Sequence, residues 1–418
     1  MRSRLWLCFL ILIGGACRSS IEVPLEANPE RAVSGSLRSV SGIGHYPALK
    51  SRALFWWVGL SDALPVAHGV RLYRVEYWTT DPAGRRAYAS GLVALPSTAA
   101  FRGIVSYQHP TRTERTNVPS TPSRTALLAA IAFAGHGYVL AAPDYLGLGT
   151  SPGLHPYLHA ASEASSVIDL LRAARLLVRH KGHEWPQALF LTGFSQGGHA
   201  TLAAQRALEE NPVDGLRVTA SAPVAGTYNL SRIQFPFALE GHSESHPAYL
   251  GYMTTAYAHI YGESLTSAVI DPYGRDLPEL FDGSRPLKEV AAALPQAPAE
   301  MFRPEFLGAF AAGEGTWLGR ALALNDVVDW TPQAPVRFYY GTRDQDSPPA
   351  DTLSTVEHMR RRGGAVSAVN VGENDHSEVV YLAVPRIRAW FDQFAPPACC
   401  GRSREASGGA TVSAEGAR

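Results

Sequence analysis

One eight-residue stretch, LTGFSQGG at 191–198, constrains the fold more than any other part of the chain. It places Ser195 between Gly193 and Gly197, after an apolar run and before an alanine-rich segment. A buried strand that passes directly into a helix forces a sharp turn, which leaves the serine exposed at the apex. A β-carbon at either glycine position would collide with the neighbouring strand or helix, so the G-x-S-x-G pattern fits this context.

The rest of the chain alternates short apolar runs, typical of strands, with segments whose apolar residues have helical spacing. The predicted strands are 70–80, 85–96, 101–109, 137–144, 188–194, 217–225, 336–341 and 365–372, and the predicted helices are 123–135, 158–180, 196–210, 350–362 and 377–394. The first two strands are separated by Asp81-Pro82-Ala83-Gly84, which predicts a hairpin. Strands that alternate with helices predict an α/β fold with a mostly parallel central sheet flanked by helices.

Residues 228–330 interrupt this alternation. About a hundred residues are too many for a loop, and the segment 286–296 has a helical pattern. We therefore expect a mostly helical cap inserted into a core formed by 51–227 and 331–395. The aromatic stretches 233–241 and 249–262 are candidates to line an acyl pocket, although most such residues are expected to form the core of the cap itself.

The first residues of the chain predict export. Residues 1–17 combine a basic start with a short apolar run, too short for a normal membrane span, and are predicted to be a signal peptide. The small residues before Cys17 resemble a bacterial lipoprotein signal, which predicts lipidation of Cys17 and a cell-envelope location. The alternative is an ordinary secretory signal and a periplasmic or secreted protein. Residues 18–50 are predicted to be a tether, and 396–418 a disordered tail.

The composition excludes several classes of function. Lysine and arginine number 37 and aspartate and glutamate also 37, so the formal net charge is zero, which argues against a nucleic-acid partner. Only four cysteines are present, without the spacing of a metal site or a disulfide framework. The cysteines therefore predict neither a metal site nor a disulfide-based fold.

A serine hydroxyl needs a base and an orienting acid to become a nucleophile, and in this type of strand–turn–helix site the acid and then the histidine follow the serine in the chain. Asp344 and Asp346 both lie just after the predicted strand 336–341, and Asp344 is preferred. His376 follows the strand 365–372 and precedes the last helix, where a base can lean over Ser195.

The oxyanion of an acyl-transfer intermediate requires N–H donors. The N–H of Gln196 at the start of its helix is the first candidate. The second is expected in the loop after strand 101–109, where Pro110 has no N–H and Thr111 supplies the next one. His109 is expected to shape this loop by hydrogen bonding rather than to act as the base.

With these residues identified, the chain resembles the secretory lipases of the lipase-A type, a group of α/β-hydrolases known from yeasts and bacteria. The motifs that carry the resemblance are SYQHPT (106–111), GHGYVLAAPDYLGLG (135–149), HPYLHA (155–160), GFSQGG (193–198), GTRDQDSPP (341–349) and NDHSEVVYLAVPRIRAWF (374–391). The resemblance implies hydrolysis of carboxylic esters or triacylglycerols, with a small-molecule ester or lipid as the partner and without a metal or an organic cofactor. It also implies that Ser195, Asp344 and His376 form the triad, and that the 109–111 loop and Gln196 form the oxyanion hole. Pro110 departs from the family, where many relatives have glycine.

Two other functions remain compatible with the sequence. A serine peptidase or an acyltransferase can use the same fold and triad, because the pocket decides the leaving group and the acceptor. A non-catalytic surface lipoprotein would keep the fold for binding alone. An ester hydrolase is the function that the sequence favours.

Overall fold

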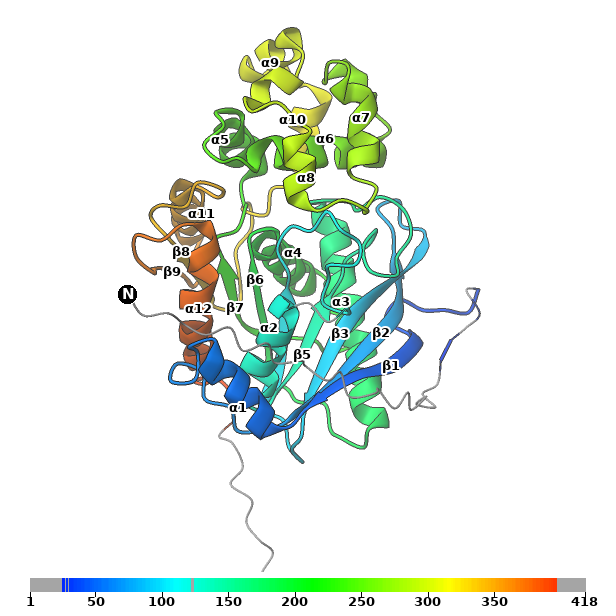
Figure 1. Cartoon of the computed structure of the whole chain (residues 1–418), viewed down its shortest axis with the longest axis vertical. Coiled ribbons are helices and arrows are strands. Elements are labelled where there is room, and N and C mark those ends of the chain that lie inside the picture. Colours follow the sequence, from blue (N-terminus) through cyan, green and yellow to red (C-terminus); the bar gives the residue numbers. More distant parts are fainter. Residues whose placement is uncertain (1–24, 27, 29, 122–123, 397–418) are drawn as a thin grey trace, which may run out of the picture.

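The computed structural model describes residues 25–26, 28, 30–121 and 124–396. The predicted signal peptide with Cys17 and the tail from 397 onward lie outside these residues. Within the described ranges, nine strands form one sheet in the order β1-β2-β3-β5-β4-β6-β7-β8-β9 (Figure 1). No helix in that part of the chain is long and apolar enough to cross a membrane.

The larger part of the sheet is parallel. It consists of β4 (Gly103–Gln108), β5 (Tyr138–Pro143), β6 (Leu189–Phe194), β7 (Val218–Val224), β8 (Val336–Tyr340) and β9 (Val366–Asn370). Every residue of β4, β5 and β6 is buried. Helices cover these strands on both faces, which is why their sequences are nearly continuous apolar runs.

The predicted hairpin is confirmed. Strands β2 (Val70–Thr80) and β3 (Arg86–Pro96) pair antiparallel along their whole length. The carboxylate of Asp81 closes the turn by accepting hydrogen bonds from the N–H groups of Ala83 and Arg85. An aspartate at the start of a turn commonly bonds the backbone two residues on, as it does here.

The tether predicted over 18–50 is wrong for residues 37–50. Strand β1 (Leu37–Tyr46) pairs antiparallel with β2 at the edge of the sheet, and helix α1 (Ala48–Trp57) follows it. Two irregularities interrupt the register of β1, and most of its residues are only half buried. An edge strand of this kind, rich in glycine and serine, lacks the regular apolar alternation by which a strand is predicted.

The helices cover both faces of the sheet. One face is covered by α1, α2 (Arg124–Ala134) and α12 (His376–Phe391), which share one apolar core. The other face is covered by α3 (Ala160–His180), α4 (Gln196–Glu210) and α11 (Pro349–Arg361) (Figure 1). This arrangement is the predicted α/β-hydrolase fold.

A mostly helical cap is inserted between β7 and β8 and lies beyond one end of the sheet (Figure 1). It contains α5 (Phe235–Leu239), α6 (His246–Tyr261), α7 (Tyr273–Leu280), α8 (Leu287–Ala292), α9 (Pro304–Ala311) and α10 (Trp317–Leu324), with a short π-helix at Leu230–Gln234 and short 3₁₀-helices at Leu265–Ser267 and Pro298–Met301. Many of its aromatic residues, such as Phe235, Tyr257 and Phe281, are buried in the cap's own core, as expected.

The two ends of the cap are fastened to each other. The N–H of Val327 donates to the carbonyl oxygen of Tyr228 at 3.0 Å, and Asp326 accepts from the N–H and the hydroxyl of Ser231. The carboxylate of Asp351, at the start of α11, accepts from the N–H of Tyr228 at 2.9 Å. The cap therefore joins the core through a short, hydrogen-bonded neck.

Candidate active site

Ser195 stands at the turn between β6 and α4, with φ 59° and ψ −122°. Such a positive φ is rare for a residue with a side chain and costs energy that the surroundings must supply. Gly193 and Gly197, two positions before and after Ser195, have no room for a side chain. A β-carbon on Gly193 would lie 2.2 Å from the carbonyl oxygen of Gly197, and one on Gly197 would lie 2.0 Å from that of Gln108. The local sequence thus dictates the strained turn.

Ser195, His376 and Asp344 form a chain of hydrogen bonds. The Oγ of Ser195 lies 2.9 Å from Nε2 of His376, and Nδ1 of His376 lies 2.8 Å from Oδ2 of Asp344. The other oxygen of Asp344 accepts from the N–H groups of Asp346 and Ser347 at 2.9 and 2.8 Å. Asp344, and not the alternative Asp346, is the carboxylate that contacts the ring.

The topology brings these three residues together. Each follows the carboxyl end of a parallel strand, β6, β8 or β9, and these ends meet at one edge of the sheet. Two hydrogen bonds join the loops after β8 and β9. The N–H of Thr342 donates to the carbonyl oxygen of Gly372, and the N–H of Arg343 donates to that of Asn374.

A capping box fixes the position of His376 at the start of α12. Asp375 accepts from the N–H groups of Ser377 and Glu378, and the side chain of Glu378 accepts from the N–H of Asp375. These reciprocal bonds define where the helix begins. His376, the first residue of the helix, is therefore held in place from both sides.

The surroundings of His376 favour its use as a base. Burial lowers its pKa, but the hydrogen bond and charge of Asp344, with the charges of Asp346 and Asp375, outweigh burial and raise the pKa above its ordinary value. The ring of Phe194 packs against the imidazole of His376, with 4.7 Å between the two ring centroids. In the neutral ring, Nδ1–H donates to Asp344 and the lone pair of Nε2 faces the serine hydroxyl.

The predicted oxyanion donors lie on adjoining segments. Because the carbonyl oxygen of Gln108 lies so close to Gly197, the loop after β4 packs directly on the turn at Ser195. Among the described residues, the N–H groups of Gln196 and Thr111 have no hydrogen-bond partner. The Thr111 hydroxyl lies 2.8 Å from that of Tyr157, which borders the space beside Ser195. Both amides are thus free to donate.

His109 is part of this loop's structure. Its Nδ1 lies 2.7 Å from the carbonyl oxygen of Pro110 and its Nε2 3.2 Å from that of Asp144. Burial lowers the pKa of His109 to about 3, so the ring is neutral and its single N–H donates to one of these two oxygens. These contacts agree with a role in shaping the loop.

A small cavity lies beside Ser195, between the core and the cap. Its volume of about 20 Å³ is enough for a water molecule but not for an ester. The residues that line it are Tyr157, Leu158, Ser195, Thr227, Gln234, Ala238, Tyr249, Leu250, Met253, Asp346 and Ser347. Both aromatic stretches of the cap contribute to this lining, although most of their residues pack within the cap.

Sequence reasoning missed a second group of buried polar residues behind the serine. Glu163, on α3, contacts both Gln196 and His199 at the start of α4, and His155 contacts Gln196 from another side. The available signal was Glu163 itself, a single acid among the small residues of AASEASS. A carboxylate on the buried face of a helix is seldom found without a partner.

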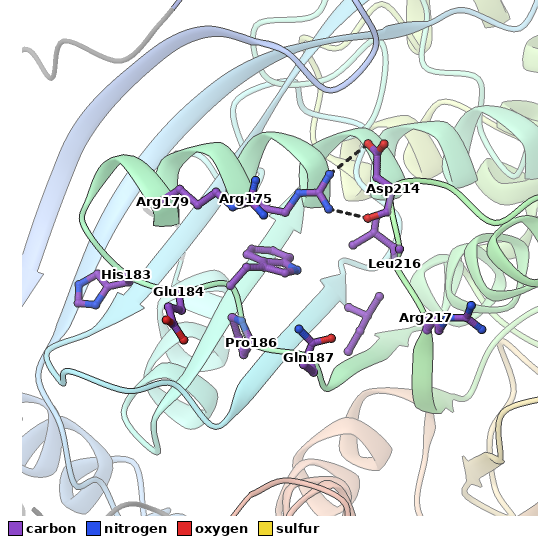
Figure 2. Close-up of a pocket in the computed structure, with 12 residues that line it drawn as sticks. Arg175, Arg179, His183, Glu184, Pro186, Gln187, Asp214, Leu216 and Arg217 are labelled. Atoms are coloured by element: carbon purple, nitrogen blue, oxygen red, sulfur yellow. Dashed lines mark hydrogen bonds and ion pairs between the residues drawn. The ribbon is translucent and has the colours of Figure 1, made fainter.

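A larger pocket of about 550 Å³ lies away from Ser195 (Figure 2). It is formed at the amino ends of β6 and β7, whereas Ser195 follows the carboxyl end of β6. Its charges have both signs, and Arg175 bonds Asp214 across it. Within the described ranges, no group of His, Cys, Asp and Glu is arranged to hold a metal ion.

No protein-family model matches this sequence, and no curated protein matches it. Solved structures do match. A hydrolase candidate from Legionella pneumophila is 30% identical over 86% of this chain and 98% of its own, with a TM-score of 0.80. The rice cell wall degrading esterase LipA from Xanthomonas oryzae is 26% identical over 87% of this chain and all of its own, with a TM-score of 0.78. Candida antarctica lipase A shares the fold, at 17% identity over 90% of this chain and 86% of its own, with a TM-score of 0.63.

Proposed function

Because this chain belongs to the α/β-hydrolase lipase and esterase family, we propose that it is a serine carboxylic-ester hydrolase. The observation that carries the proposal is the hydrogen-bonded chain from Ser195 through His376 to Asp344. The motifs shared with the lipase-A type favour that branch of the family. Acylglycerols and shorter acyl esters are the proposed substrates.

The first half of the reaction forms an acyl-enzyme. Nε2 of His376 removes the proton of the Ser195 hydroxyl as the oxygen attacks the ester carbonyl carbon. Asp344 keeps the ring in the required tautomer and stabilises its charged form. The amides of Gln196 and Thr111 donate to the oxyanion, and each such donor is worth about 3 kcal/mol of barrier. His376 then protonates the departing alcohol.

The second half releases the acid. Water enters where the alcohol left, gives a proton to His376 and attacks the acyl carbon. The same two amides hold the second oxyanion, and its collapse returns the proton to Ser195. The products are one carboxylic acid and one alcohol for each ester and water consumed, and the reaction needs no metal or organic cofactor.

Substrate entry requires the cap side chains to move. The cavity beside Ser195 holds no more than a water molecule, so an ester must displace groups such as Tyr249 and Met253 of α6. A cap that closes over the serine favours small or flexible substrates over folded proteins.

The direct test is the Ser195→Ala variant. We expect p-nitrophenyl esters to be hydrolysed by the wild type and not by the variant, and a fluorophosphonate probe to label only the wild type. Esters of graded acyl length, assayed beside aminoacyl anilides and an alcohol acceptor, separate an esterase from a peptidase or an acyltransferase. Unchanged ester turnover in Ser195→Ala would refute the proposal.

We also propose that the protein is exported and carries a lipid on Cys17. The support is the sequence of the first 17 residues. Metabolic labelling with a fatty-acid analogue in a bacterial host should mark the wild type and not Cys17→Ser. Labelling of neither protein, with release into the medium, would indicate an ordinary secretory signal instead.

A further inference from the structure

A buried ion pair lies behind the proposed nucleophile and is not used in the reaction itself. Oε2 of Glu163 lies 2.6 Å from Nδ1 of His199, and both side chains are almost completely inaccessible to solvent, at 1% and 0%. Burying two charges is expensive unless the pair has good geometry and its remaining donors and acceptors are satisfied. The other hydrogen bonds of Glu163 and His199 therefore show which neighbouring groups the pair positions.

Both nitrogens of His199 face acceptors. Nδ1 faces Glu163, and Nε2 lies 2.8 Å from the carbonyl oxygen of Asn325. A carbonyl oxygen can only accept, so satisfying it and an ionised Glu163 requires a proton on each nitrogen. Burial lowers the pKa of His199, but the charge and hydrogen bond of Glu163 outweigh burial and raise it. The two acceptors and the raised pKa both favour the charged ring, which cannot serve as a second base.

The other oxygen of Glu163 holds the side chain of Gln196, the residue next to Ser195. Oε1 of Glu163 lies 2.8 Å from Nε2 of Gln196, and Nε2 of His155 lies 2.8 Å from the same nitrogen. Nδ1 of His155 donates to the carbonyl oxygen of Leu146 at 2.7 Å, so its Nε2 is the acceptor. Burial lowers the pKa of His155 to about 4, which agrees with the neutral ring.

The carboxamide of Gln196 is thus held through its nitrogen alone. Its two hydrogens go to Glu163 and His155, and its oxygen has no partner among the described residues. Removal of Glu163 would leave His155 as the only hydrogen-bond partner of this side chain. The N–H of the same residue is a proposed oxyanion donor, so its orientation depends on these contacts.

The same pair also connects the serine turn to the end of the cap. Asn325, which follows α10, bonds His199 through its carbonyl oxygen and the hydroxyl of Tyr261 on α6 through its amide nitrogen, at 2.8 Å each. Its side-chain oxygen accepts from the N–H of Ala160 at 2.9 Å. One set of contacts thus joins the helix of Ser195, the helix of Glu163 and the cap.

We propose that Glu163 and His199 are positioning residues, which fix Gln196 so that its backbone N–H points at the oxyanion. This inference rests on the proposed ester hydrolysis. An interaction made with the oxyanion acts in the transition state, so its loss should lower kcat and leave KM nearly unchanged.

The test replaces the whole pair, because removal of one partner would leave an uncompensated buried charge. Glu163→Leu combined with His199→Leu substitutes apolar side chains, a change that often preserves stability. We expect this variant to keep a cooperative melting transition while its kcat for p-nitrophenyl acetate falls about tenfold or more. A role of the pair in folding alone predicts wild-type kcat in every molecule that folds, and this result would overturn the inference.

A double-mutant cycle tests the connection to Gln196. We expect Gln196→Leu to lower kcat by a factor similar to that of the pair replacement. Combining the two should cost little more than either alone, because both remove the same constraint. Independent, multiplicative effects would contradict the inference. The control is Asp169→Leu, which removes another buried carboxylate of α3, paired with Arg172, and should lower the melting temperature without changing kcat.

Glu163→Gln provides a rescue. The new carboxamide can accept from Gln196 through its oxygen and donate to Nδ1 of a neutral His199, so most of kcat should remain. A loss as large as that of the pair replacement would show that charge, and not positioning, is what matters, and would also contradict the inference.

The failure of this inference can be told apart from the failure of the proposed function. If the wild type has no more esterase activity than Ser195→Ala, the proposed function is wrong. If the wild type is active and the pair replacement has the same kcat, only the positioning role is wrong. Fluorophosphonate labelling counts the competent sites in each preparation, so kcat is expressed per active serine.

Discussion

Adding one methyl group at Gly197 should disable the enzyme through its backbone. The β-carbon of Gly197→Ala would lie 2.0 Å from the carbonyl oxygen of Gln108, 2.6 Å from its carbonyl carbon and 3.0 Å from the carbonyl oxygen of His109. Side-chain rotation cannot relieve these contacts, because all three atoms belong to the backbone. Real β-carbons keep at least 3.0 Å from such atoms, so the turn and the loop must separate by 3.0 − 2.0 = 1.0 Å or more.

That displacement acts on both proposed oxyanion donors, because Gln196 lies on one side of the contact and Thr111 on the other. A misplacement of 1 Å costs roughly 100-fold in rate, and the loss of one oxyanion donor costs about 10²- to 10³-fold. We therefore expect kcat for p-nitrophenyl acetate to fall about 100-fold or more. Overpacking should also lower the free energy of unfolding by about 1–3 kcal/mol.

The matched control is Gly308→Ala in α9. The same methyl group would meet nothing within 4 Å at that position, and alanine in a helix is about 0.5–1 kcal/mol more favourable than glycine. We expect unchanged kcat and a slightly higher melting temperature for the control. If Gly197→Ala kept a kcat within a few fold of the wild type, the argument from this close contact would be refuted.

Three further predictions concern titratable groups. Asp344→Asn should lower kcat on the order of 10³- to 10⁴-fold while Ser195 stays in place, because the amide favours the wrong tautomer of His376; a loss of less than tenfold would contradict this. The value of kcat/KM should rise with pH through the pKa of His376, since only the neutral ring accepts the serine proton, and an acid limb centred below the ordinary value of 6.5 would contradict the raised pKa. Burial, partly offset by the N–H groups of Tyr228 and Asn229, raises the pKa of Asp351 to about 7 from 3.8. Between these values the folded state holds a proton that the unfolded state releases, so this group makes stability fall as pH rises, by up to about 1.4 kcal/mol per pH unit. Denaturant unfolding at about pH 4 and about pH 7 should show a flatter pH dependence for Asp351→Asn, and identical slopes in the two proteins would contradict the prediction.

The sequence predicts the parallel strands and the helices beside them well. The signal is strongest for β4, β5 and β6, because strands buried on both faces are nearly continuous apolar runs. The structure also brings together the three residues proposed as the triad. Strand–turn–helix chemistry defines the place of Ser195, and chain order and strand ends define those of Asp344 and His376. These signals are local and do not depend on how the cap packs.

The parts that the sequence did not predict depend on contacts between distant segments. Strand β1 is stabilised by pairing with β2 and not by its own pattern, so the sequence predicts a tether at this place. Glu163 and His199 are 36 residues apart, and nothing in either neighbourhood indicates that they meet. The cap's helices are short and irregular, and only α8 was indicated beforehand by its sequence.

The closed neck of the cap has an evolutionary consequence. Ser221 of β7 pairs with Val336 of β8 although about a hundred residues separate them, so the sheet is continuous across the insertion. Tyr228 and Val327 bring the ends of that insertion side by side. A segment with this geometry can be lengthened, shortened or exchanged for another without changing the pairing of the strands that carry Ser195, Asp344 and His376. Substrate preference can therefore diversify in the insertion while the chemistry is inherited intact.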